Sequence, residues 1–356
     1  MRTPIAGPCG WRGEEMAHSR RWIFEMGDAA LAEIERALRG CQAKGIPWHA
    51  TTRESFPLPT LSRQLAEVAR ELEDGSGMAK LRRLPVERYA PDELRQIWFG
   101  IGCNLGRPVF QNRKGEMMRE IRDEGAEVGQ RYGEIRDEQR GGATVLSSYA
   151  RTLSNGALRF HTDRTDVVGL LCANQARAGG VSRLASSVAI HNEMLKRRPD
   201  LVELLYGDYH RSRFGEESIA AEDIYALPIF GVAEGKFTSH YSLTYIEIAQ
   251  MVPGIPPLSA KQREAIDLLM ALAGELAFEM TLEPGDMQLL NNHVIYHGRT
   301  PFEDDAPGGR TRLLYRLWLS MPNSRPLPAG QEVLWGRIEA GAVRGGIAQA
   351  AAAPAA

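Results

Sequence analysis

Apolar residues recur at helical spacing in the first third of the chain. Three stripes of this kind cover residues 28–38, 61–72 and 91–102. Apolar residues three or four positions apart lie on one face of a helix, so each stripe predicts an amphipathic helix. Asp28 is a typical capping residue for the first helix, and Gly75 ends the second. We expect these three helices to serve as packing surfaces.

The second half of the chain changes to strand patterns. Residues 167–173 are a continuous apolar run of strand length, and residues 229–232 and 237–241 flank a short turn that contains glycine. Two strand-like runs around such a turn predict a β-hairpin. Residues 287–291 and 313–319 are further runs of strand length. We therefore expect an α+β protein, with a β core framed by helices.

A helix interrupts these strands, and two segments fit neither pattern. Ser259 and Gln262 have the spacing of a capping box, which predicts a helix through Leu276. Residues 113–142 are charged and interrupted by glycines, so we expect a long loop there, and such loops often act as lids. The Ala/Gly-rich residues 341–356 are expected to be a disordered tail.

The domain organisation follows from the absence of a clear linker. We expect a single domain over residues 1–340, with a helical part over 20–112 and a β core over about 145–322. A chain of 356 residues is long for one domain, but large β enzymes often reach this size.

The charge and composition of the chain indicate which kinds of molecule it binds. The formal net charge is −2, and 43% of the residues are hydrophobic, as in an ordinary soluble protein. This balance gives no general attraction to nucleic acid or to a membrane, so we expect a small-molecule substrate and leave a homo-oligomer open. The four cysteines are far apart, and the first residues lack the apolar stretch of a signal peptide. We therefore expect a cytoplasmic protein.

Histidines and one aspartate supply the first candidate chemistry. His161 and Asp163 follow strand-like residues, and side chains two positions apart on a strand point the same way. The pair could hold a metal ion or simply share a hydrogen bond. His293 and His297 are four positions apart, so on a strand they too would share a face. None of these pairs decides the chemistry alone.

Two arginines follow on a single strand face. In the run RTRLLYRLWLS, Arg312, Leu314 and Arg316 alternate with apolar residues that belong to the core. Guanidinium groups that point into an enclosed space are costly unless an anion meets them. A dicarboxylate is a natural partner, because arginine binds carboxylates in a bidentate way.

The order of these groups resembles a known family. The quoted motifs FHTD (160–163), AGGVSRLAS (178–186), PGDMQLLNNHVIYHGRT (284–300) and RTRLLYRLWL (310–319) are similar to those of the taurine dioxygenase (TauD/TfdA)-like Fe(II)- and 2-oxoglutarate-dependent oxygenases. A weaker similarity covers residues 90–112. Two histidines and one carboxylate hold Fe(II) in such enzymes and leave coordination positions open. The resemblance implies a double-stranded β-helix (jelly-roll) core with flanking helices.

By this resemblance, His161, Asp163 and His297 are the metal ligands and His293 is not. The resemblance further implies that Arg316 and Ser182 bind the far carboxylate of 2-oxoglutarate, while Arg312 lies near its 1-carboxylate. The residues expected to bind the metal or 2-oxoglutarate are therefore His161, Asp163, His297, Ser182, Arg312 and Arg316.

The implied reaction uses Fe(II), 2-oxoglutarate and O2. The expected activity is oxidation of an unactivated C–H bond of a small polar metabolite. We expect hydroxylation of an amino acid, a small carboxylate or a natural-product intermediate, with release of succinate and CO2. Related enzymes that halogenate lack the ligating carboxylate, so Asp163 argues against halogenation.

Contacts to the second substrate are the least determined. Arg159 shares the strand face of His161, so it could meet an anionic substrate group or pair with an acid of the lid. Asn155 and Arg299 are further candidates. Two other functions stay open: a metal-dependent cupin isomerase or lyase, which would not need the two arginines, and a jelly-roll binding module, which would need no metal.

Overall fold

The strands form two principal sheets, as seen in a computed structural model that describes residues 2–137, 141–216 and 223–348. Within these residues, the larger sheet has seven strands in the order β1–β2–β16–β8–β19–β3, and β4 also pairs with β19. All these neighbours are antiparallel except β1 and β2. Its strands are β1 (Ile23–Glu25), β2 (Met78–Arg82), β3 (Arg107–Pro108), β4 (Met118–Ile121), β8 (Val167–Asn174), β16 (Met287–Asn291) and β19 (Leu313–Ser320).

The smaller sheet has four strands in the order β15–β10–β17–β7. They are β7 (Leu158–His161), β10 (Ser182–Ser186), β15 (Phe278–Met280) and β17 (Ile295–Arg299). Four two-stranded pairs complete the described β structure. They are β5 (Glu134–Asp137) with β6 (Ala143–Leu146), β9 (Ala178–Gly179) with β18 (Phe302–Glu303), β11 (Asp208–Ser212) with β12 (Ile224–Pro228), and β13 (Phe230–Ala233) with β14 (Lys236–Ser239).

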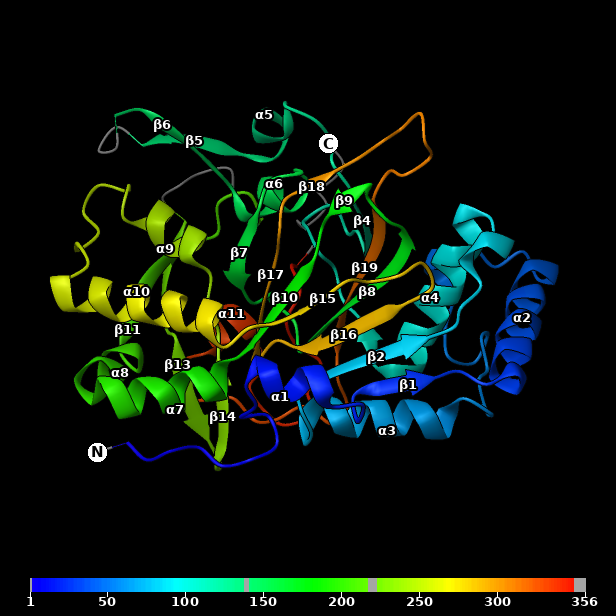
Figure 1. The fold of residues 1–356 in the computed structure, drawn as a ribbon, viewed down its shortest axis with the longest axis horizontal. Coiled ribbons are helices and arrows are strands. Elements are labelled where there is room, and N and C mark those ends of the chain that lie inside the picture. Colours follow the sequence, from blue (N-terminus) through cyan, green and yellow to red (C-terminus); the bar gives the residue numbers. More distant parts are fainter. Residues whose placement is uncertain (1, 138–140, 217–222, 349–356) are drawn as a thin grey trace, which may run out of the picture.

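Helices cover the two sheets from different sides. Figure 1 shows α7, α8 and α10 gathered on one side of the strands and α2 and α4 on the opposite side. The helices are α1 (Gly13–His18), α2 (Asp28–Ala43), α3 (Ser62–Glu73), α4 (Pro91–Leu105), α5 (Val128–Tyr132), α6 (Ser148–Thr152), α7 (Ser187–Arg197), α8 (Pro199–Leu205), α9 (Leu243–Ala249), α10 (Ala260–Glu275) and α11 (Glu332–Trp335), with 3-10 turns η1 (Trp48–Ala50) and η2 (Val86–Arg88). No described helix is both long and apolar enough to cross a bilayer.

Strand β19 shows how alternation divides the core. Tyr315 and Leu317 pack with the N-terminal helices, and Trp98 of α4 donates a hydrogen bond to the Tyr315 carbonyl at 3.0 Å. Leu314 and Trp318 face the other way and belong to a separate cluster of buried apolar residues. The strand therefore has one wholly apolar face and one face that can carry polar groups toward the space between the sheets.

Most of the expected elements are confirmed. The three N-terminal stripes are α2, α3 and α4, and the predicted hairpin is β13–β14. The capping box of Ser259 and Gln262 opens α10 as predicted. The expected role of Asp28 as a cap is wrong, because Asp28 is the first helical residue and Gly27 occupies the capping position.

Two segments expected to be irregular are largely ordered. The prediction of a bare loop over 113–142 is wrong, since this segment contains β4, α5 and β5; residues 138–140 lie outside the described residues. The prediction of a disordered tail from residue 341 is also wrong for 341–348. Arg344 and Ile347 are buried there, because the tail folds back onto polar and apolar partners. Residues 349–356 lie outside the described residues.

Candidate active site

The three predicted metal ligands converge at the edge of the smaller sheet. His161 on β7 lies directly opposite His297 on β17 in the antiparallel register, so both rings project from the same face. Their ring centroids are 4.2 Å apart. Asp163 follows two residues after His161, and its carboxylate oxygens lie 3.7 Å from Nε2 of His161 and 3.9 Å from Nε2 of His297. Each of the three residues offers one ligand atom, and these three atoms all lie within 4.8 Å of one another.

The protonation of these groups suits a cation. Nδ1 of His161 lies 2.9 Å from the Arg159 carbonyl, which can only accept, so Nδ1 carries the proton and Nε2 presents its lone pair. Burial lowers the pKa of both histidines, that of His297 to about 3. The charge of Arg316 adds to the shift in both, and His161 adds to the shift of His297. Burial raises the pKa of Asp163, but the charges of Arg316 and the two histidines lower it by more, so the net shift is downward. Two neutral imidazoles and one carboxylate are a donor set that fits Fe(II).

Two residues hold Asp163 in place. The indole Nε1 of Trp318 donates to Oδ2 of Asp163 at 2.9 Å. The backbone N–H of Asp163 donates to Oδ1 of Asn292 at 2.9 Å. Such contacts orient a ligating carboxylate before the metal arrives. Sequence reasoning missed both residues, although Trp318 continues the alternation that begins at Arg312 and so was readable from the strand pattern.

Arg316 lies beside the metal ligands. Its Nη1 is 3.7 Å from Oδ2 of Asp163, and its Nε donates to Oε1 of Gln111 at 2.7 Å. Gln111 in turn donates from Nε2 to the Arg316 carbonyl at 2.9 Å. This reciprocal pair fixes the guanidinium next to the ligands. Gln111 lies on an irregular segment far away in sequence, where no local signal marked it.

Arg312 lines the same pocket but directly precedes β19, about 13 Å along an extended chain from Arg316, which places it away from the ligand cluster. It lines the pocket together with Ser182 and Arg299, and all three are buried. Ser182 and Arg299 are directly opposite each other in the β10–β17 register, which places them on one face. The pocket walls thus come from both sheets, with the histidines at one end and Arg312 at the other.

The two buried arginines carry unused hydrogen-bond donors. Nη1 of Arg312, and Nε and Nη1 of Arg299, have no hydrogen-bond partner among the described residues. Burial lowers the pKa of Arg299 to about 9 and that of Arg312 to about 10, and for Arg299 the charge of Arg312 contributes to the shift. Buried donors without partners are costly, so this end of the pocket fits an anionic group.

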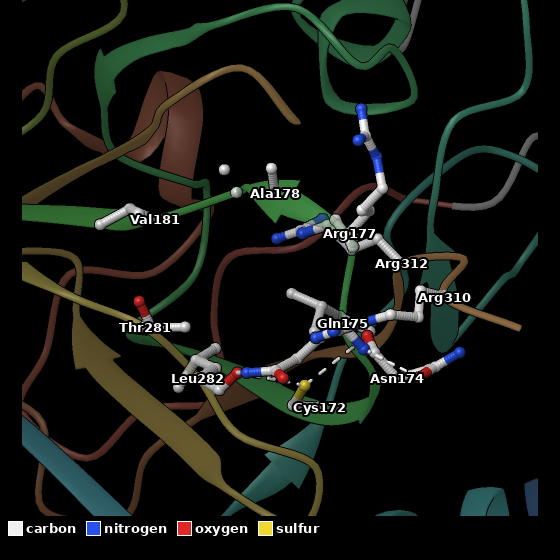
Figure 2. A pocket seen from close by; sticks show the side chains of 14 residues that line it. Cys172, Asn174, Gln175, Arg177, Ala178, Val181, Thr281, Leu282, Arg310 and Arg312 are labelled. Atoms are coloured by element: carbon white, nitrogen blue, oxygen red, sulfur yellow. Dashed lines mark hydrogen bonds between the residues drawn. The ribbon is translucent and has the colours of Figure 1, made fainter. Parts of the chain in front are cut away.

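Arg312 lines not only the metal pocket but also a second pocket, which Figure 2 shows from close by. Its volume is about 220 Å³, and two exposed arginines, Arg177 and Arg310, lie along it. Arg177 forms an ion pair with Glu303. Arg312 therefore separates the metal pocket from an outer hollow with a cationic lining.

The proposed substrate contacts have different surroundings. Arg159 forms an ion pair with Glu247 of α9 at 2.8 Å and also donates to Thr244, so it pairs with an acid outside the 113–142 segment. Asn155 is exposed. Arg299 is the candidate that lines the metal pocket, where its Nη2 donates to the carbonyls of Ser154 and Gly156 at 2.6 Å.

His293 occupies a separate buried cluster. Its Nε2 donates to Oδ1 of Asp166 at 2.8 Å, and its Nδ1 accepts from the Thr238 hydroxyl at 2.9 Å. Arg344 from the C-terminal segment also donates to Oδ1 of Asp166 at 2.8 Å. The non-ligand place expected for His293 agrees with these contacts.

The sequence matches the family model described as "Taurine catabolism dioxygenase TauD, TfdA family" over residues 42–318. It is 29% identical over 336 residues to FR-33289 synthase of Streptomyces rubellomurinus (strain ATCC 31215), covering 92% of this chain and 94% of that protein. It is 30% identical over 309 residues to taurine hydroxylase-like protein SAT17 of Stachybotrys chartarum (strain CBS 109288 / IBT 7711), covering 85% of this chain and 76% of that protein.

Solved structures share the fold. An asparagine oxygenase in complex with Fe(II), 2S,3S-3-hydroxyasparagine and succinate superposes with a TM-score of 0.62 at 17% identity, covering 84% of this chain and 94% of that chain. The non-heme iron oxygenase OrfP in complex with Fe, succinate and (3S)-hydroxy-L-Arg gives a TM-score of 0.56 at 14% identity, with coverage of 84% and 94%. At these identities the similarity establishes the mixed α/β architecture with its large sheet.

Proposed function

Because the chain belongs to the TauD/TfdA family of dioxygenases, we propose that it oxidises an unactivated C–H bond of a small polar metabolite with Fe(II), O2 and 2-oxoglutarate. The observation that carries the proposal is the pocket itself. Two neutral imidazoles and an ionised carboxylate stand at one end, and buried arginine donors without partners stand at the other. A metal-dependent isomerase or lyase would need the first end and leave the second unexplained.

His161, Asp163 and His297 would hold the iron. When bound, Fe(II) and 2-oxoglutarate would activate O2: one oxygen atom would go into succinate as the keto acid loses CO2, and the other would oxidise the C–H bond. The protein residues do the positioning: Trp318 and Asn292 fix the Asp163 carboxylate, and the Arg159 carbonyl fixes the tautomer of His161. Asp163 and His297 are buried and His161 is partly buried, which limits the access of water to these groups.

We assign the arginines in the reverse of the order expected from the sequence. Arg312, with its unused Nη1 and with Ser182 in the same pocket, would bind the far carboxylate of 2-oxoglutarate. Arg316, at 3.7 Å from Asp163, would lie at the metal end near the 1-carboxylate. Strand alternation gives a face and not a depth along it, so the sequence alone does not order the two arginines along the pocket.

We extend the proposal to fold and location. The two largely antiparallel sheets that contribute walls of the pocket would be the halves of a double-stranded β-helix. The core and the N-terminal helices would form a single oxygenase domain over 1–340, to which residues 341–348 also attach. Four cysteines without a disulfide among the described residues favour a reducing, cytoplasmic setting.

Amino acids lead the candidate substrates. The asparagine oxygenase and OrfP structures hold hydroxylated amino acids. Two relatives are named for other compounds, as FR-33289 synthase and as taurine hydroxylase-like protein SAT17. Hydroxylation of an amino acid, a small carboxylate or a natural-product intermediate is therefore the reaction that we propose.

An anaerobic titration tests the cofactor site. We expect Fe(II) followed by 2-oxoglutarate to give the weak visible charge-transfer band of a keto acid chelated to ferrous iron. The variant His297→Ala should lose the band, while His49→Ala, which changes an exposed histidine of η1, should keep it. Iron binding without a band would favour the isomerase or lyase. Absence of both would favour a binding module.

A further inference from the structure

A large cavity adjoins the metal pocket beneath the 113–142 segment. Its volume is about 670 Å³, and its lining includes Arg119, Tyr149 and Glu216. Arg119 on β4 lies directly opposite Arg316 on β19 in the antiparallel register, so the two side chains share a sheet face. The cavity is therefore a neighbour of the metal ligands on the same face of the larger sheet.

Several charges of this cavity are already satisfied within the protein. Arg119 donates to Glu116 and to Glu124, with all three distances at 3.1 Å, and its guanidinium lies 5.2 Å and 5.0 Å from the ring centroids of two tyrosines. Arg131 also pairs with Glu124 at 3.4 Å. These groups neutralise one another, so they are poor candidates for recognising a charged ligand.

Glu216 differs from these acids. Its Oε1 accepts a hydrogen bond from the buried hydroxyl of Tyr245 on α9, and among the residues that the structure describes this is the only hydrogen bond of the Glu216 carboxyl group. Burial raises the pKa of Glu216, with the Asp163 charge adding to the shift, whereas Tyr245, Arg164 and Arg316 oppose it. The carboxyl group thus lies in reach of the charges of the metal site, but it makes no ion pair in the described part of the chain.

We propose that Glu216 binds a protonated amino group of the second substrate at the metal end of this cavity. Tyr245 positions the Glu216 carboxylate for this contact. This inference rests on the proposed function and deepens it by selecting amine-bearing metabolites, free amino acids above all. Glu216 becomes a specificity-determining residue of the oxygenase.

The geometry favours an ammonium group over a guanidinium. A guanidinium binds a carboxylate best through both oxygens, and Tyr245 already occupies Oε1 of Glu216. One free oxygen suits the point donors of an ammonium ion. A half-buried carboxylate gains most from a partner of opposite charge, which also offsets the cost of its burial.

Binding can be measured without turnover. The full-length protein is loaded anaerobically with Fe(II) and 2-oxoglutarate, and the charge-transfer band is followed while probes are added. The probes are the twenty free amino acids and the diamines putrescine and cadaverine, each compared with the form in which every amino group is acetylated and so carries no ammonium charge. We expect at least one free amine to shift the band and its acetylated form to bind about tenfold to a hundredfold more weakly, as for loss of a charged hydrogen bond.

Variants test whether Glu216 carries this preference. Glu216→Gln should weaken binding of the active amine by a similar factor, Glu216→Asp should recover part of it, and Glu134→Gln should leave it unchanged. Glu134 is a good control because it is an exposed acid on the wall of the same cavity. The Fe(II)–2-oxoglutarate band without amine and the melting temperature should stay the same in all three, which separates recognition from a structural role.

The outcomes distinguish the two proposals. A band that forms but is shifted by no amine, or equally by amine and acetylated form, overturns the inference and leaves the proposed function standing. Equal amine binding by Glu216→Gln and the native protein also overturns it. Failure of the band itself overturns the proposed function.

Discussion

Arg312, which directly precedes β19, and Arg316 within it have different surroundings, and this difference predicts different phenotypes. Arg312→Gln should weaken 2-oxoglutarate binding by about tenfold to a hundredfold, because the buried donors facing the far carboxylate lose their charge. Fe(II) binding should be unchanged, since Arg312 lies away from the ligands. Anaerobic titration of the charge-transfer band measures both. Arg310→Gln, an exposed neighbour in the outer pocket, is the control, and a normal affinity in Arg312→Gln would contradict our assignment.

Trp318 acts through the carboxylate that it holds. Trp318→Phe keeps an aromatic ring in the core but removes the donor to Asp163, so we expect Fe(II) affinity to fall about tenfold to a hundredfold. Competition with a chelator under anaerobic conditions gives the affinity. Trp98→Phe removes a comparable indole bond, to the Tyr315 carbonyl on the apolar face, and should affect stability alone. Equal iron affinities in the two variants would refute the role of Trp318.

At the scale of elements, the C-terminal segment behaves as part of the core. Arg344 donates from Nε to Asp166 at 2.8 Å and from Nη2 to the Arg325 carbonyl at 2.7 Å. Arg344→Met removes the positive charge that pairs with the buried Asp166 carboxylate, so the free energy of unfolding should fall by about 3–5 kcal/mol. Arg337→Met breaks an exposed pair with Glu339 and should cost about 0–1 kcal/mol. Denaturant unfolding compares them, and equal losses would show that the segment is not a structural element.

Element prediction succeeded where one periodicity dominated. The stripe that became α3 and the alternation that became β19 both reflect burial on a single face. It failed over 113–142 and 341–348, because the order there comes from distant partners. Strand β4 exists through pairing with β19, and Arg344 is ordered by Asp166. Such contacts leave no periodic trace in the local sequence.

The whole molecule brings the site together from separate regions. The identities of His161, Asp163 and His297 were readable from their motifs, but their meeting depends on the pairing of β7 with β17. Gln111 and Glu216 reach the site through tertiary packing, and neither lies in a motif that chemistry alone would single out. Sequence therefore singled out three residues that meet in the fold, but it did not single out the groups that surround them.

Acid sensitivity of the folded state follows from a histidine that the fold keeps neutral. His293 is fully buried, and its Nε2 donates to Asp166 while its Nδ1 accepts from Thr238. Burial lowers its pKa to about 4, although Asp166 opposes this shift. In the unfolded chain the pKa returns to about 6.5, so between these values the unfolded state binds the extra proton. The stability is fully present above about pH 6.5 and is lost as the pH falls toward 4.

The expected loss is about 1.4 kcal/mol per pH unit at most, or about 2–3 kcal/mol over this range. Urea unfolding of the metal-free protein at several pH values between 7 and 4.5 measures it. His161 and His297 contribute in the same direction, since burial lowers their pKa values too. The part due to His293 is therefore the difference from His293→Gln, which should be less stable at pH 7 but should lose less stability on acidification. Parallel curves for the two proteins would mean that His293 does not couple folding to pH.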